Sequence, residues 1–79
     1  MKVTAKLFAK LRDRAPEAAK GSAFDVELPG ACTVGDLLRD WEIPEDIPLV
    51  IFVNSVHAEK DRVLQEGDVL AVFPPVGGG

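Results

Sequence analysis

The sequence has few of the residues that build metal centres and membrane segments. It contains one cysteine and one histidine, Cys32 and His57, among 79 residues. A structural zinc site takes four ligands and a cysteine-bound iron–sulfur centre takes four thiolates, so neither is expected. The longest uninterrupted apolar run covers residues 49–53, far short of the roughly 20 residues of a membrane-spanning helix. We therefore expect no metal, no bound cofactor and no contact with a membrane.

Positive charge is also scarce, because the formal net charge is −4. An acidic chain is a poor ligand for nucleic acid or for an anionic membrane surface, but it is compatible with a basic pocket on a protein partner. The first four residues lead directly into an alternating strand pattern rather than into the apolar region of a signal peptide. With one cysteine and no targeting segment, a cytoplasmic location is expected.

Two half-buried strands are predicted near the N-terminus. Apolar and polar residues alternate over residues 2–8 and again over residues 24–28, which is the period of a strand with one buried face. A short helical turn is expected over residues 8–13, with Leu11 packed inward. The loop that follows contains helix and strand breakers, and its length suits antiparallel pairing of the two strands.

The strongest helix signal begins at Thr33. This residue is a good N-cap, and Asp36 stands at the position that completes a capping box. Pro44 prevents continuation of the helix. Four apolar residues recur at helical spacing and are expected to be buried against a sheet. They are Val34, Leu37, Leu38 and Trp41.

The second half of the chain reads as further strands. Residues 49–53 are continuously apolar and rich in β-branched side chains, which predicts a central strand buried on both faces. Residues 56–58 are expected to start a weak return strand, residues 62–64 are expected to form a short strand or bridge, and a last strand should end at Phe73. The order of elements predicts an α+β protein with the β-grasp, ubiquitin-like fold: a mixed sheet of four to five strands with one helix packed across it. Residues 1–73 would form this domain.

Residues 74–79 are expected to form an extended, flexible C-terminal tail. Pro74 and Pro75 lack N–H donors and stop the β-ladder. Val76 is the last bulky side chain, and Gly77, Gly78 and Gly79 have no Cβ to obstruct a narrow passage. The six residues reach roughly 20 Å when extended. A thin stalk that ends in the Gly79 carboxylate suits insertion into another protein's active site, although glycine-rich ends are also typical of linkers.

The remaining polar residues offer little for catalysis. Cys32 precedes a helix, where a thiolate is favoured, but a lone cysteine is more often a small buried residue. The serines and threonines have no His–Asp arrangement nearby, and the only glycine cluster is terminal. Arg12 stands between Lys10 and Arg14. Its local pattern slightly favours a solvated charge, and a salt bridge with a partner is the alternative.

Several motifs together resemble one family. They are FAKLRD at residues 8–13, TVGDLL at residues 33–38, VN at residues 53–54, GD at residues 67–68, and FPPVGGG at residues 73–79. The chain is similar over nearly its whole length to the small subunits of molybdopterin synthase, the MoaD-like ubiquitin-like sulfur carriers. The final Gly-Gly is common to all such carriers, whereas FPPV and FAxLRD are more specific. Gly77, where the family often has Ala, is one departure, and the alanine-rich loop over residues 14–22 is another.

The resemblance implies a mechanism and a set of partners. An E1-like adenylating enzyme would use ATP to activate the Gly79 carboxylate, and a sulfur donor protein would convert it to a thiocarboxylate. The tail would then enter the large subunit of molybdopterin synthase, which supplies the catalytic side chains, and give sulfur to a cyclic pterin phosphate. The resulting dithiolene holds molybdenum or tungsten. The residues expected to bind the partner are Arg12, Phe73, Pro74, Pro75, Val76, Gly77 and Gly78.

Other functions remain open at this stage. A carrier for thiamine synthesis, cysteine synthesis or tRNA thiolation would share the tail and differ only in its partner. A ubiquitin-like modifier would instead be joined through its C-terminus to lysines of other proteins. An interaction module with an incidental tail would keep its function after deletion of the tail.

Overall fold

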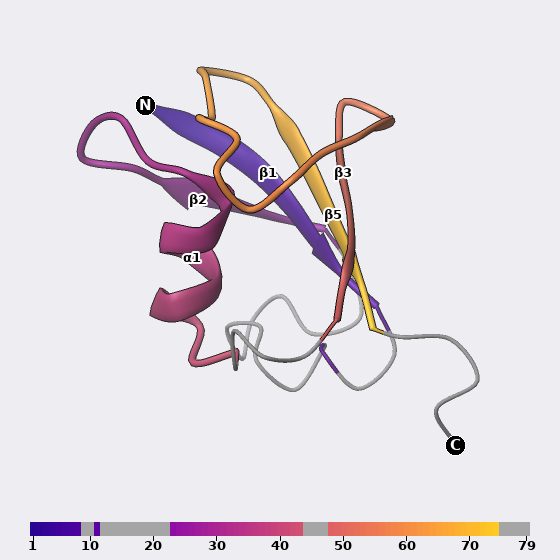
Figure 1. Ribbon diagram of the computed structural model, residues 1–79. Helices are drawn as coiled ribbons and strands as arrows, with labels where there is room; N and C mark the ends of the chain where they lie inside the picture. Colours follow the sequence, from indigo (N-terminus) through magenta and orange to yellow (C-terminus); the bar gives the residue numbers. More distant parts are fainter. Residues whose placement is uncertain (9–10, 12–22, 44–47, 75–79) are drawn as a thin grey trace.

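The computed structural model describes residues 1–8, 11, 23–43 and 48–74. Within these ranges it contains a five-stranded sheet with strand order β2-β1-β5-β3-β4 and one helix (Figure 1). The elements are β1 (Lys2–Leu7), β2 (Phe24–Glu27), α1 (Val34–Asp40), β3 (Val50–Val53), β4 (Val56–His57) and β5 (Val69–Phe73). This is the predicted β-grasp arrangement, with the first and last strands in the interior of the sheet.

Strand pairing sets which side chains lie next to one another. β1 pairs antiparallel with β2, as predicted, and parallel with β5, where Lys6 lies opposite Ala71. β3 runs antiparallel to β5 and β4, which places Phe52 opposite Ala71 on one side and opposite His57 on the other. Lys6, Ala71, Phe52 and His57 therefore form one transverse line across four strands.

One face of the sheet carries the core. Alternate residues of β1, β3 and β5 are buried and share a single cluster with the inward side of α1. Its most deeply buried side chains include Val3, Val34, Leu38, Val53, Leu64, Leu70 and Val72. Figure 1 shows α1 on this side of the sheet. Leu11 also joins the core, as predicted.

The helix begins where the sequence indicates. The Thr33 hydroxyl accepts a hydrogen bond from the Asp36 amide at 3.1 Å, and the Asp36 carboxylate accepts one from the Thr33 amide at 3.0 Å. These reciprocal bonds satisfy two amides that a helix leaves unpaired at its start. Trp41 is only half-buried, contrary to prediction, because it stands at the C-cap and packs edge-on against Phe24. No helix in the described ranges is long and apolar enough to cross a membrane.

The prediction that residues 49–53 are buried on both faces is wrong. In β3, Ile51 and Val53 are buried, whereas Val50 and Phe52 are half-buried. No helix or strand in the described part of the chain covers the second face of the sheet. The apolar side chains on that face therefore form a surface.

A polar network joins the turn between β3 and β4 to the turn that precedes β5. Asn54 has a positive φ of 54° and donates from its side-chain amide to Asp68 at 2.9 Å. The side-chain oxygen of Asn54 accepts from the Val69 amide at 2.9 Å. Asp68 is buried, and its second oxygen accepts from the Gln65 amide at 2.8 Å and lies 3.9 Å from the Arg62 guanidinium. The network fixes the β3–β4 turn relative to the start of β5.

Candidate functional site

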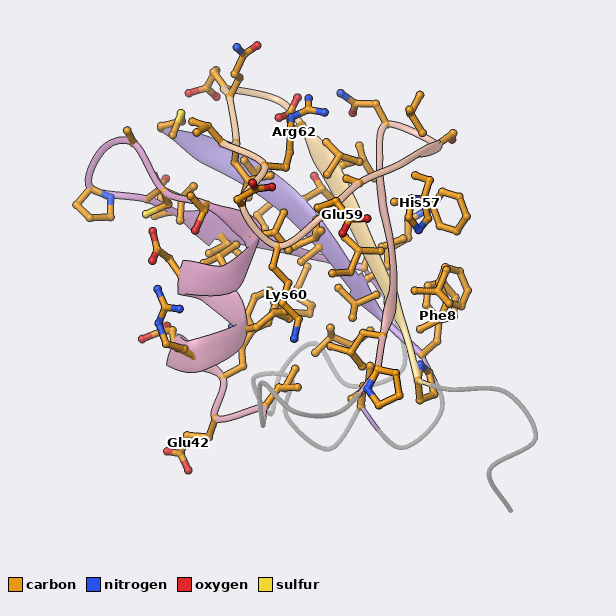
Figure 2. The ribbon with its side chains drawn as sticks, viewed as in Figure 1. Phe8, Glu42, His57, Glu59, Lys60 and Arg62 are labelled. Atoms are coloured by element: carbon orange, nitrogen blue, oxygen red, sulfur yellow. The ribbon has the colours of Figure 1, made fainter. Side chains whose placement is uncertain are left out.

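Four aromatic side chains form a continuous line on the uncovered face of the sheet. Phe8 and Phe73 are stacked with ring centres 4.2 Å apart and planes inclined by 6°. Phe52 meets the Phe73 ring edge-on at 5.9 Å, and His57 meets Phe52 edge-on at the same distance. Figure 2 shows Phe8 and His57 on the side of the sheet that faces away from α1. We call these four residues the aromatic row.

The sheet explains why the row forms. Phe73 and Phe52 occupy outward positions of β5 and β3, because the residues that directly precede them, Val72 and Ile51, face the core. Phe8 follows β1 and donates its amide to the Val72 carbonyl at 3.2 Å, which extends the parallel ladder by one bond. Each aromatic therefore comes from a different strand or strand end. Edge-to-face and offset-stacked pairs are the favourable arrangements for such rings.

The row borders an apolar hollow of about 350 Å³. Its three phenylalanines share the lining with Val69 and Ala71, while Lys6 and Ser55 supply the polar groups. Large apolar side chains around a shallow hollow are typical of the anchor region of a protein interface. Among the described residues, the lining contains no histidine and no carboxylate that could act as a general base. The chemistry of this face therefore favours binding of another protein over catalysis by its own side chains.

The predicted tail starts at the edge of the hollow. Phe73 is both the last residue of β5 and a central member of the aromatic row, and half-buried Pro74 follows it directly. The structure thus brings two of the predicted partner-binding residues to one place. The others lie outside the described residues and remain predictions, as does the role of the terminal carboxylate: Arg12, Pro75, Val76, Gly77, Gly78 and Gly79.

Sequence reasoning missed the contacts of Phe8 and Phe52 on this face. The alternation predicted over residues 2–8 already places Phe8 on the same face as Lys6, but it does not predict the contact with Phe73. Phe52 lies in the strand that is predicted to be covered on both faces. Phe52 required the register between β3 and β5, and that register is not visible in the sequence.

Cys32 and His57 do not line the hollow itself, although His57 belongs to the aromatic row. Cys32 is half-buried beside the core, not fully buried as expected. His57 lies 3.8 Å from Glu59, and both side chains are exposed (Figure 2). Within the residues that the structure describes, no three potential metal ligands come together.

Comparison with known proteins shows which family this chain resembles. The model of the ThiS family matches residues 5–79. A putative molybdopterin converting factor, subunit 1, from Pyrococcus furiosus is 31% identical with a TM-score of 0.70, and the match covers 96% of this chain and 99% of that one. The small archaeal modifier protein SAMP1 from Haloferax volcanii is 30% identical with a TM-score of 0.68 and is matched over 100% of both chains.

A third structure supports the fold alone. It is a complex of subunits 1 and 2 of the molybdopterin-converting factor from Helicobacter pylori 26695. Identity is 21% and the TM-score is 0.61, with 100% of both chains covered. These likenesses confirm the β-grasp fold and the predicted resemblance to ubiquitin-like sulfur carriers.

Proposed function

We propose, from the premise that this chain belongs to the ThiS family of ubiquitin-like sulfur carriers, that Gly79 carries sulfur for molybdopterin synthase. The observation that carries the proposal is the position of Phe73. This residue ends β5, lines the apolar hollow and immediately precedes the Pro74 that opens the tail. A partner docked on the aromatic row would therefore have its active site within reach of the tail.

The length of the tail supports separate roles for the uncovered face of the sheet and for the tail. Five residues follow Pro74, and an extended segment of that length spans up to about 17 Å. Pro74 and Pro75 restrict the backbone before binding, which lowers the entropy lost when the tail is ordered in a partner. The face would supply affinity, while the tail would supply the reacting group.

The proposed chemistry takes place at the Gly79 carboxyl carbon. A carboxylate oxygen attacks the α-phosphorus of ATP in the activating enzyme, and pyrophosphate leaves. A sulfur nucleophile at the oxidation level of hydrosulfide, supplied by a donor protein, displaces AMP and leaves a thiocarboxylate. In the large subunit, this sulfur bonds to a side-chain carbon of the cyclic pterin phosphate, and an oxygen substituent of that carbon leaves as a phosphate oxygen or as water. Water then cleaves the acyl–sulfur bond and restores the carboxylate, so each dithiolene needs two loaded carriers.

The likeness to SAMP1 supports a second candidate function, modification of proteins. That relative is named a modifier and is as similar in sequence as the molybdopterin-related one, at 30% against 31% identity. A modifier would use the same adenylated Gly79 but transfer its acyl carbon to a lysine amine. Carriers for thiamine, cysteine or tRNA thiolation would share the loading step and differ in the acceptor.

The test follows the terminal carboxylate through both steps. The chain is incubated with ATP, the activating enzyme and the sulfur donor of its own organism, and its intact mass is measured. We expect the increase that corresponds to exchange of one oxygen for sulfur. Addition of the large subunit and cyclic pterin phosphate should return the original mass and form the dithiolene. Isopeptide-linked products without a thiocarboxylate would instead establish the modifier function.

Deletion of Gly79 is the variant that tests the proposed sulfur delivery most directly. It leaves a terminal carboxylate that is about 3.5 Å short of its target, whereas reacting atoms must approach within about 3–3.5 Å. We expect an unchanged melting curve, near-normal affinity for the large subunit and no sulfur delivery. A shortened chain that loads and delivers sulfur at the wild-type rate would disprove the proposed mechanism.

A further inference from the structure

Among the residues that the structure describes, Lys6 is the one charged side chain that lines the apolar hollow. It is exposed and lies on the outward face of β1, opposite Ala71 and in the same transverse line as Phe52. Among the described residues, no ion pair or hydrogen bond of its ammonium group is seen. The neighbouring carboxylate of Asp25 accepts a hydrogen bond from Thr4 at 3.2 Å. A positive charge thus stands within a surface whose other described lining residues are aromatic or aliphatic, apart from Ser55.

We propose that the protein that docks on this hollow presents a carboxylate to Lys6, next to an apolar side chain that packs against the aromatic row. This inference rests on the proposed function and adds to it the chemistry of the partner's surface. The occupant is the protein that receives the tail, since Phe73 lines the hollow and the predicted tail begins with the next residue, Pro74.

The position of Lys6 makes burial of its charge unavoidable in such a complex. A partner that covers the row from Phe8 to His57 must also cover the line that contains Lys6 and Ala71. Ala71 has a small side chain, so the lysine stem can lie across it toward Phe52. An ammonium group that loses water without gaining an acidic partner is strongly unfavourable. A carboxylate on the partner removes that cost and also fixes the orientation of docking.

The partner charge that Lys6 favours is opposite in sign to the partner charge that the rest of the chain favours. The net charge of −4 favours partners that are basic overall, and such a surface would repel Lys6 if the basic region extended across the hollow. A partner with an acidic group at this one place can bind, whereas a uniformly basic surface is rejected. Lys6 would therefore act as a specificity-determining residue within an apolar anchor.

The experiment compares Lys6→Gln, Lys6→Met and Lys6→Arg with the control Lys2→Gln. Lys2 lies on the same strand and the same face but does not line the hollow. Association and dissociation rates are measured with the large synthase subunit of the same organism at several salt concentrations. We expect Lys6→Gln and Lys6→Met to raise Kd by at least about 10-fold, mainly through faster dissociation, as for a buried charge pair that loses one member. Lys6→Arg should retain most of the affinity, and Lys2→Gln should change only the association rate.

The partner's carboxylate is then located with a double-mutant cycle. Each acidic residue of the large subunit is replaced singly by its amide, and one of these variants should lose no further affinity when combined with Lys6→Gln. The inference is overturned if Lys6→Met binds as tightly as the wild type or more tightly. It is also overturned if light scattering shows a dimer that Lys6→Gln abolishes, because a second copy would then occupy the hollow. Either result leaves loading of Gly79 intact, whereas failure of the proposed function appears as absence of the thiocarboxylate.

Discussion

Replacement of Phe73 by alanine should separate the binding role of the uncovered face from the stability of the fold. Phe73 is half-buried, and its ring contacts Phe8 and Phe52 rather than the core. The neighbouring Val72 points the other way and is 0% exposed. Phe73→Ala and Val72→Ala therefore form a matched pair on one strand, with one variant on each face of the sheet.

The structure sets the expected magnitudes. Phe73→Ala removes two aromatic contacts, each worth about 0.5–1.5 kcal/mol beyond burial of area, from an incompletely buried site. We expect the free energy of unfolding to fall by about 1–2 kcal/mol. Val72→Ala removes two fully buried methyl groups and leaves a cavity, so a loss of about 2–3 kcal/mol is expected. In the complex the order reverses, because truncation of a central aromatic anchor costs at least about 2 kcal/mol, or roughly 30-fold in Kd.

The assay combines two measurements on the same preparations. Urea unfolding, followed by circular dichroism, gives the free energy of unfolding, and calorimetry with the large synthase subunit gives Kd. Val72→Ala should bind within about twofold of the wild type under conditions in which it is folded. The reasoning is refuted if Val72→Ala weakens binding as much as Phe73→Ala does. It is also refuted if Phe73→Ala lowers stability by as much as it lowers binding.

Two further predictions concern the polar groups that shape the fold. Asp68→Asn should lower the free energy of unfolding by about 2–4 kcal/mol in chemical denaturation, because an NH₂ group would face the Asn54 or Gln65 donor in place of an acceptor; a loss below about 0.5 kcal/mol would contradict the network. The Thr33 amide hydrogen bond lowers the pKa of Asp36 from its ordinary value of 3.8. Folding therefore disfavours protonation of Asp36, so its stabilising contribution is present above that value and is lost as pH falls through the lowered pKa. Asp36→Asn should show a smaller decrease in stability with acid than the wild type, and equal slopes would show that the capping carboxylate has no such role.

The sequence predicted the parts of the fold that depend on local patterns. Alternation identified β1 and β2, and Thr33 with Asp36 marked the start of α1 because both capping partners are close in sequence. The surface nature of β3 was not predictable, since a continuous apolar run has the same pattern whether its second face meets a helix or a partner. The aromatic row depends on register between strands that are distant in sequence. A partner-binding role for Phe73 stays a prediction, whereas its contacts with Phe8 and Phe52 required the structure.

The central pairing of β1 with β5 also bears on when the molecule can fold during its synthesis. These strands lie far apart in the sequence, and both contribute side chains to one shared core. During translation, β1 has no partner strand on the β5 side until β5 itself has been synthesised. Contacts between such distant segments also slow folding, because a long loop must close before they form. Folding is therefore expected to follow synthesis of β5, so that shorter nascent fragments present no assembled aromatic row to the partner enzymes.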